Sequence, residues 1–213
     1  EILMEIENQK NLVGKRKEME NTADKHLPFQ LTGQEDALFA LLMEVVEHFK
    51  LQAVLRVAGG WVRDKLMGRT SHDIDIAIDT LYGKEFAEKL VDYMRLQNRT
   101  KDVGGIGVIK SNPDQSKHLE TATVKVLGIE IDFVNLRAEE YADSRIPTTR
   151  IGTAEEDALR RDLTINALFY NLATRQVEDL TGRGREDLAL GAVRTPLEPR
   201  RTLTDDPLRA LRA

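Results

Sequence analysis

The 213-residue sequence contains no cysteine. This absence excludes a disulfide framework, a thiolate metal site and a cysteine nucleophile, and it fits a reducing compartment. No apolar run approaches the length of a membrane-spanning helix, so we expect no membrane partner. The formal net charge is −5, which argues against a broad DNA- or RNA-coating surface, because such affinity comes mainly from neutralising phosphates. A nucleic acid would have to meet a local basic patch or another part of the molecule.

Several common catalytic motifs are also absent. There is no G-x-x-x-x-G-K-[ST] motif, which disfavours a P-loop NTPase, and no nucleophile elbow of a serine hydrolase. The four histidines show no ligand spacing. The glycine cluster "VGGIGVIK" (103–110) lacks the G-x-G-x-x-G spacing, so we interpret it as a turn or loop.

The composition is ordinary for a folded domain, with 41% hydrophobic and 31% charged residues, and predicts a mixed α/β or α+β fold. Periodicity, capping residues and glycines predict a series of elements along the chain. In order, these are a solvated helix in 1–25, helix 32–50, strand 53–58, helix 61–67, strand 72–79, a helix through Phe86, Leu90 and Met94, two β segments within 118–136 meeting at Gly128, an irregular stretch 138–152, helix 154–172, a turn-rich connector 178–188 and the start of a helix at 205–213.

Two aspartates in "HDIDIAID" are the first candidate for chemistry. Asp73 and Asp75 alternate with isoleucines, so their side chains project from one face of a strand about 7 Å apart. Carboxylate oxygens at this spacing suit Mg²⁺, although a solvated strand edge would have the same pattern. Asp132 shows the same alternation on another strand. Three converging acids would provide the arrangement that two-metal phosphoryl transfer requires.

Gly59 and Gly60 stand where a strand is expected to turn into a helix. Glycine permits close backbone approach, and a helix N-terminus offers free N–H groups to a phosphate. Arg63 could add a charge-assisted hydrogen bond. An ordinary turn would explain the two glycines equally well.

Two later polar groups are candidates for nucleotide contacts. Asp162 and Asn166 are four residues apart on the predicted helix 154–172 and could read ribose hydroxyls, with an arginine directed toward phosphate. An i,i+4 surface pair is the alternative. Near the end of the sequence, Asp206, Arg209 and Arg212 recur every three residues, as in either a phosphate- or base-reading group or a solvated helix face.

In chain order, "GGWVRDKLMGRTSHDIDI", "EIDFVNLR", "RRDLTINALF" and "DDPLRALR" resemble the catalytic half of the class II tRNA nucleotidyltransferases. These are the CCA-adding enzymes, which are grouped with bacterial poly(A) polymerases in the polymerase-β-like superfamily. The residues of these motifs are most similar to those of fungal members. The resemblance implies an α+β fold, in which a small mixed or antiparallel sheet flanked by helices forms the head. It also implies an N-terminal extension (1–31), the head domain (32–182) and the start of a helical neck (183–213).

The resemblance further implies specific roles. Asp73 and Asp75 would bind Mg²⁺ in a two-metal site, and Asp132 would be the third catalytic acid, near the primer 3′-hydroxyl. The implied nucleotide-binding residues are Gly59, Gly60 and Arg63 for the triphosphate, Arg161, Asp162 and Asn166 for the nucleotide and its ribose, and Asp206, Arg209 and Arg212 for the base. Residues 138–152 match a flexible loop that helps the enzyme switch from C to A addition.

The implied reaction is addition of CMP and AMP from CTP and ATP to the tRNA 3′ end, with release of pyrophosphate. Members of this class hold tRNA mostly through neck, body and tail regions that follow their catalytic half. A poly(A) polymerase and a noncatalytic nucleotide-binding fragment are the alternatives. An intracellular location is expected, in the cytoplasm, nucleus or mitochondrion.

Overall fold

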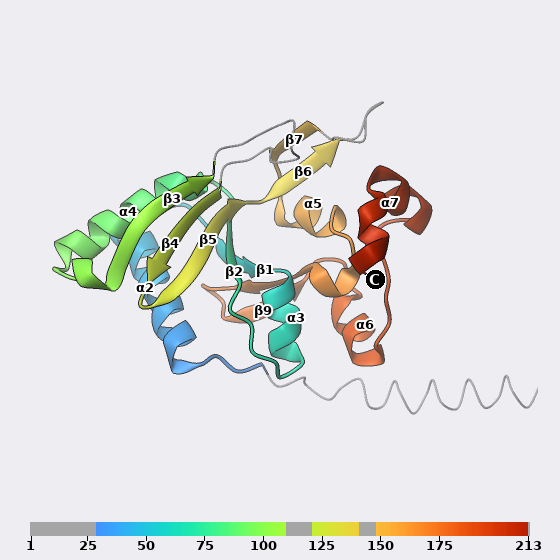
Figure 1. Cartoon of the computed structure of the whole chain (residues 1–213), viewed down its shortest axis with the longest axis horizontal. Coiled ribbons are helices and arrows are strands. Elements are labelled where there is room, and N and C mark those ends of the chain that lie inside the picture. Colours follow the sequence, from blue (N-terminus) through green and yellow to red (C-terminus); the bar gives the residue numbers. More distant parts are fainter. Residues whose placement is uncertain (1–28, 110–120, 141–147, 213) are drawn as a thin grey trace, which may run out of the picture.

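The computed structural model describes residues 29–109, 121–140 and 148–212, and its centre is a seven-stranded sheet (Figure 1). The strand order is β3-β4-β5-β2-β1-β8-β9, and every neighbouring pair is antiparallel except β2 and β5, which run parallel. The strands are β1 (Leu55–Ala58), β2 (Ile74–Ile78), β3 (Val103–Ile109), β4 (Thr121–Val126), β5 (Ile129–Asn135), β8 (Leu168–Asn171) and β9 (Gln176–Asp179). A separate antiparallel pair consists of β6 (Arg137–Glu140) and β7 (Thr148–Ile151).

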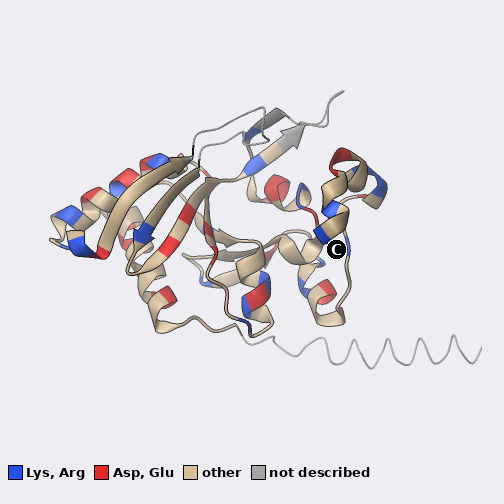
Figure 2. Cartoon of the chain, viewed as in Figure 1, with Lys and Arg blue, Asp and Glu red and all other residues tan. Residues whose placement is uncertain are grey.

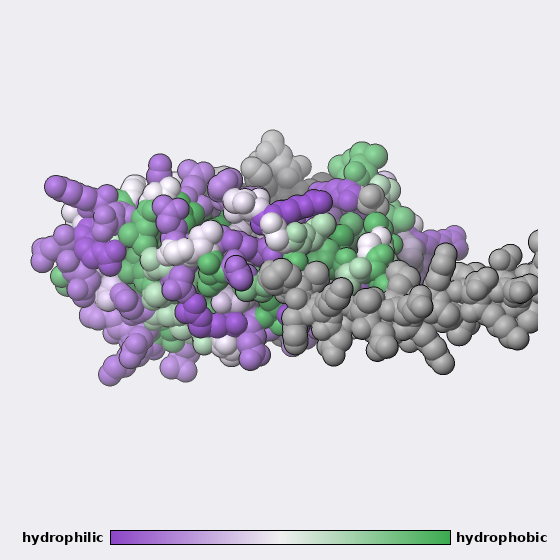
Figure 3. Space-filling view, turned by 90° about the horizontal axis from the view of Figure 1, so that it is seen from below, coloured by the Kyte–Doolittle hydropathy of each residue, from purple (hydrophilic) through white to green (hydrophobic). Residues whose placement is uncertain are grey.

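Helices lie on both sides of this sheet. They are α2 (Gly33–His48), α3 (Gly60–Leu66), α4 (Gly83–Leu96), α5 (Ala154–Leu159), α6 (Gly184–Leu190) and α7 (Pro199–Asp205), with 3₁₀ turns η1 (Thr100–Asp102), η3 (Thr164–Asn166) and η4 (Pro207–Arg212). In Figure 1, α4 lies at the left, along β3 and β4, whereas α5, α6 and α7 lie at the right. No described helix is long and apolar enough to cross a bilayer. On the face seen in Figure 3, hydrophilic residues interrupt the hydrophobic areas.

The two faces of the sheet carry different cores. Ile74, Ile76 and Ile78 of β2 are buried in the main core, together with residues of α2, α3 and α4. Ala77 points to the opposite face, where a smaller cluster includes Ala158 of α5. The alternation predicted for this strand is therefore confirmed, and Asp75 shares a face with Ala77.

Several predicted elements are confirmed. The capping box of Thr32 and Glu35 begins α2, Gly59 precedes α3, and two strands meet at Gly128. The helix expected around Leu90 is α4. The helix predicted in 1–25 lies outside the described residues.

Three predictions of loops or irregular stretches were wrong. Residues 103–110 are not a loop, because 103–109 form β3, an edge strand with a register shift between Val103 and Ile106. The stretch 138–152 is not irregular throughout, since its two ends pair as β6 and β7. The connector 178–188 contains the end of β9 and most of α6. The helix start expected in the last segment is present as η4, a 3₁₀ helix that begins at Pro207, and Asp206 accepts a hydrogen bond from the Leu208 N–H at 3.1 Å.

The predicted helix 154–172 was the largest error. The helix α5 ends at Leu159, the chain forms η3, and β8 follows and pairs with β1 and β9. All four residues of β8 are buried, so its run "LFYN" lacks the alternation of a half-exposed strand. A short apolar run of this kind cannot be distinguished from a buried helix by periodicity.

A buried ion pair joins α2 to α3. Lys65 Nζ lies 2.6 Å from Glu35 Oε2 and 3.3 Å from the Gln30 carbonyl oxygen, and both charged side chains are less than one-tenth exposed. Burial raises the pKa of Glu35, but hydrogen bonds from Lys65 and Thr32 outweigh it and hold the pKa below its ordinary value. The pair thus fixes α3, whose N-terminus carries the two glycines.

Because the folded-state pKa of Glu35 is lowered, its contribution to stability is present above its ordinary pKa of 4.5 and is lost as the pH falls through the folded value. We expect Glu35→Gln to lower the free energy of unfolding by about 3 kcal/mol at pH 7, since Lys65 loses its buried partner. This loss should shrink at acidic pH. Urea denaturation at several pH values measures it.

Glu47→Gln is the matched control, because Glu47 is an exposed acid on the same helix. Its substitution should change the free energy of unfolding by less than about 0.5 kcal/mol. An equal loss for both variants, or a loss for Glu35→Gln that does not depend on pH, would contradict the assignment.

Candidate active site

The parallel pairing of β2 and β5 places two of the predicted acids side by side. Asp75 is the register partner of Asp132, and neighbouring strands lie about 4.8 Å apart. Asp73 comes directly before β2 and is exposed, whereas Asp75 and Asp132 are half-buried. Acidic residues lie on the central strands β2 and β5, as Figure 2 shows in red. The convergence expected from the sequence is therefore present for this pair, with Asp73 two residues away.

The acids repel one another. Burial is the largest cause that raises the pKa of Asp75, followed by the charges of Asp73 and Asp132, and together they raise it to about 6. Arg161 and Arg137 act in the opposite direction but do not offset the repulsion. Negative charge is thus in excess at this face.

Such a set of carboxylates suits a hard divalent cation. Oxygen ligands are those that Mg²⁺ prefers, and a cation would relieve the repulsion that acts on Asp75. In the part of the chain that the structure describes, no three His, Asp or Glu side chains are already gathered closely enough to form a metal site. The fit of these residues to Mg²⁺ therefore rests on their carboxylate oxygens as ligands and on the excess negative charge of the acids.

Sequence reasoning missed Thr123 of β4. It is the register partner of Asp132, and its hydroxyl donates a hydrogen bond to Asp132 Oδ1. The signal was present in the alternation of "TATVKV", which places Thr121, Thr123 and Lys125 on the face of the acids. The hydrogen bond fixes the orientation of the Asp132 carboxylate.

The predicted glycine turn lies next to one of the predicted arginines. Gly59 has φ +74° and ψ −127°, a conformation that side-chain-bearing residues rarely adopt, and its N–H donates to the Leu168 carbonyl at 2.9 Å. A Cβ at this position would lie 2.6 Å from Arg161 Nη1. Glycine is therefore required both by the backbone and by the close approach of Arg161.

One hydrogen-bonded chain joins three segments that are far apart in the sequence. Arg63 Nη1 donates to Asn166 Oδ1 at 2.6 Å, and Asn166 Nδ2 donates to Asp162 Oδ1 at 3.1 Å. Arg212 Nη1 donates to Asp162 Oδ2 at 3.3 Å. The structure thus brings together predicted nucleotide-binding residues from α3, η3 and η4.

The helical spacing expected for Asp162 and Asn166 was wrong, although the pair itself exists. The two residues do not share an α-helical face, because α5 has already ended and Asn166 lies in η3. Burial raises the pKa of Asp162, but hydrogen bonds from Asn166, the Leu163 N–H and Arg212 outweigh it, so the pKa is lowered. Asp162 is therefore held as a carboxylate that can accept hydrogen bonds.

Arg209 lies on another side of this group. Arg209 Nε is 4.0 Å from Asp206 Oδ2, and the side chain lines a cavity of about 250 Å³ between α5 and α7. Arg160, Arg201 and Thr202 also line this cavity, whereas the three acids do not. Of the predicted C-terminal stripe, Arg212 therefore joins the Asp162 network and Arg209 faces the cavity.

Comparison with known proteins agrees with this geometry. Residues 55–194 match the family described as the poly A polymerase head domain, and the chain belongs to that family. It is 52% identical over 197 residues to nucleotidyltransferase lcsQ of Purpureocillium lilacinum, covering 86% of this chain and 33% of the relative. It is 53% identical over 193 residues to the mitochondrial CCA tRNA nucleotidyltransferase of Candida glabrata, covering 86% and 36%. The chain thus spans about a third of the length of these relatives.

Solved structures share the fold. An apo form of a CCA-adding enzyme superposes with a TM-score of 0.69 at 28% identity, over 85% of this chain and 39% of that chain. A complex of a CCA-adding enzyme with CTP gives 0.63 at 28% identity, over 86% and 38%. The resemblance predicted from the motifs and the mixed sheet flanked by helices are both confirmed.

The effect of a Cβ at Gly59 can be compared with that of a Cβ at Gly68. Gly59→Ala adds backbone strain at φ +74° and ψ −127° and a clash with Arg161, whereas Gly68→Ala adds strain at φ +68° with open space around its Cβ position. We expect Gly68→Ala to cost about 1–2 kcal/mol and Gly59→Ala to cost about 1–3 kcal/mol more. Guanidinium denaturation measures both. Equal losses would show that the contact with Arg161 does not require glycine.

Proposed function

We propose that the protein is a CCA-adding tRNA nucleotidyltransferase, which transfers CMP and AMP from CTP and ATP to the tRNA 3′ end and releases pyrophosphate. The observation that carries this proposal is the register of Asp75 beside Asp132, with Asp73 two residues away. The names of the similar proteins and the fold shared with a CCA-adding enzyme in complex with CTP support it.

In this proposal, Asp73 and Asp75 hold Mg²⁺, which when bound neutralises charge on the triphosphate and makes the attacking hydroxyl more acidic. Asp132, oriented by Thr123, lies near the primer 3′-hydroxyl. The other residues bind and position the nucleotide, so that binding geometry contributes much of the rate. The triphosphate meets Gly59, Gly60, Arg63 and Arg161, the ribose meets Asp162 and Asn166, and the base meets Asp206, Arg209 and Arg212.

The rest of the assignment follows from the same proposal. Residues 32–182 form the head, 183–213 begin the neck, and 138–152 contain the loop that helps the change from C to A addition. The tRNA 3′ end is the proposed partner. Because the Candida glabrata relative is named as mitochondrial, we propose an intracellular location that includes mitochondria.

A poly(A) polymerase is the second candidate, favoured by the description of the matching family. Labelled CTP and ATP, each offered separately with a tRNA lacking its CCA end, distinguish the two. We expect addition of about two C residues from CTP alone. A poly(A) polymerase would ignore CTP and add a long A tract. Binding of both nucleotides without any incorporation by the full-length protein would indicate a noncatalytic protein.

Asp75→Asn tests the catalytic role of the acids. We expect it to lower the rate of CMP incorporation by the full-length protein on the order of a thousandfold, since loss of metal-based charge stabilisation costs several kcal/mol. A quench assay with labelled CTP measures the rate.

The matched control is Asp79→Asn, directly after the other end of β2. Asp79 Oδ1 accepts a hydrogen bond from the Val54 N–H at 2.9 Å, far along β2 from the acids, and an amide oxygen can replace it. Its rate should stay within about twofold of the unmodified protein. Near-normal incorporation by Asp75→Asn would overturn the proposed mechanism.

A further inference from the structure

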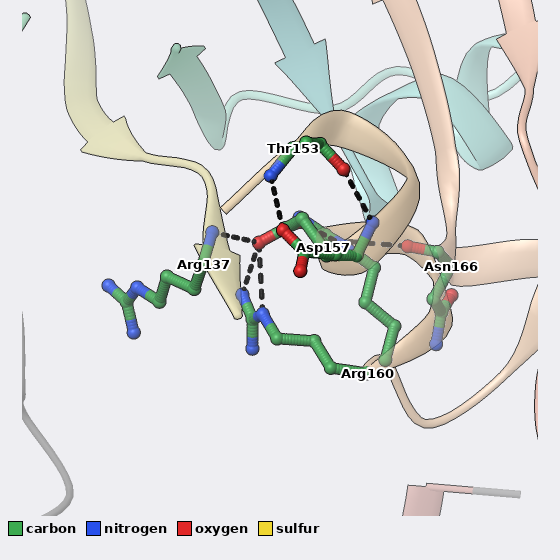
Figure 4. A network of polar contacts seen from close by, with 7 residues as sticks. Arg137, Thr153, Asp157, Arg160 and Asn166 are labelled. Atoms are coloured by element: carbon green, nitrogen blue, oxygen red, sulfur yellow. Dashed lines mark hydrogen bonds and ion pairs between the residues drawn. The ribbon is translucent and has the colours of Figure 1, made fainter. Parts of the chain in front are cut away.

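Asp157 of α5 is a buried acid that the site described so far does not include. Only 1% of the surface of Asp157 is exposed. Its carboxylate accepts hydrogen bonds from two arginine side chains and one backbone N–H (Figure 4). Oδ1 accepts from the Arg137 N–H at 2.9 Å and from Arg160 Nε and Nη2 at 2.9 and 2.7 Å. Oδ2 accepts from Arg161 Nε and Nη2 at 2.9 and 2.8 Å. The two oxygens thus bind different arginines.

These contacts determine where the Arg161 guanidinium lies. Asp157 takes its Nε and Nη2 groups, and Nη1 donates to the Asn166 carbonyl at 3.2 Å. The guanidinium carbon stands 5.2 Å from the centroid of the Phe169 ring, and Nη1 borders Gly59. Residues of α5, η3, β8 and the β1–α3 turn therefore hold one planar cation from four sides.

Arg161 is held next to the glycine turn. Because it borders Gly59, it lies at the start of α3, where the triphosphate is proposed to bind. A guanidinium whose plane is already fixed loses less conformational freedom when it meets a phosphate.

The Arg137 amide adds a second link. Arg137 opens β6, two residues after the last residue of β5, the strand that carries Asp132. The Asp157 carboxylate thus holds both Arg161 and the segment that follows β5. By comparison, the buried acid Asp187 pairs with Arg194.

We propose that Asp157 is a positioning residue of the nucleotide site, which acts through Arg161 and fixes the guanidinium that meets the phosphates of a bound nucleoside triphosphate. This inference rests on the proposed function. It assigns Asp157 no contact with the nucleotide itself.

A double-mutant cycle on CTP affinity tests the inference. The dissociation constant for CTP in the presence of Mg²⁺ is measured by titration calorimetry for the unmodified protein, Asp157→Asn, Arg161→Met and the double variant. We expect each single change to weaken CTP binding about tenfold or more, and the double variant to bind as weakly as Arg161→Met alone. Losses that multiply would overturn the inference, because Asp157 would then act independently of Arg161.

Asp187→Asn is the matched control. Asp187 is also fully buried and bound to an arginine, with Arg194 Nη1 at 2.8 Å, but Arg194 is not among the nucleotide-binding residues. The side-chain oxygen of asparagine can still accept the hydrogen bond that the Thr164 hydroxyl of η3 donates to Asp187 at 2.6 Å. It should lose stability while its CTP affinity stays within about twofold. A loss of affinity as large as that of Asp157→Asn would show that any buried acid has this effect and would overturn the inference.

Two further outcomes are distinguishable. If Asp157→Asn does not fold, the same cycle is measured with Asp157→Glu, which keeps the charge but displaces it by one methylene, and again multiplying losses overturn the inference. If the unmodified protein does not bind CTP, the proposed function fails and the inference fails with it. CTP binding without coupling between the two residues overturns the inference alone.

Discussion

The parallel pairing of β2 with β5 is the constraint on which the site depends. It places Asp75 beside Asp132 on one face, while the alternating isoleucines of β2 bury the other face in the main core. A shift of one residue in this register would send Asp75 into the core and an isoleucine to the site. The same apolar packing that stabilises the sheet therefore holds two carboxylates together against their mutual repulsion.

The nucleotide-binding half depends on a second constraint, the antiparallel pairing of β1 with β8. Gly59 follows the end of β1, and Arg161, Asp162 and Asn166 lie just before β8, so this pairing brings the glycine turn beside them. Arginines then connect the carboxylates and amides across the segments. Since Arg63, Arg161 and Arg212 each have a carboxylate, amide or carbonyl partner, the site is pre-organised, and a ligand needs to order few side chains.

Local patterns predicted much of this from the sequence. The alternation of β2, the capping box of α2 and the double glycine each report on their own neighbourhood, and each was confirmed. Strand β8 was not predicted because all four of its residues are buried, so its sequence does not alternate. Strand β3 was not predicted because its glycines are typical of a turn or loop. Thr123 was missed because its partner, Asp132, lies on another strand, and spacing along one strand does not show such a contact. Asp157 stands three and four residues before Arg160 and Arg161, a spacing that does signal ion pairs, but the sequence pattern did not show that Asp157 is buried.

Titration of Asp75 by carboxyl ¹³C NMR, without and with Mg²⁺, tests most directly whether the acids form one metal-binding centre. We expect a pKa of about 6 without metal, because burial and the charges of Asp73 and Asp132 disfavour the ionised form. Mg²⁺ should lower this pKa, since a bound cation favours the carboxylate. A pKa near its ordinary value of 3.8 that Mg²⁺ does not change would contradict the claim that these acids form one metal-binding centre.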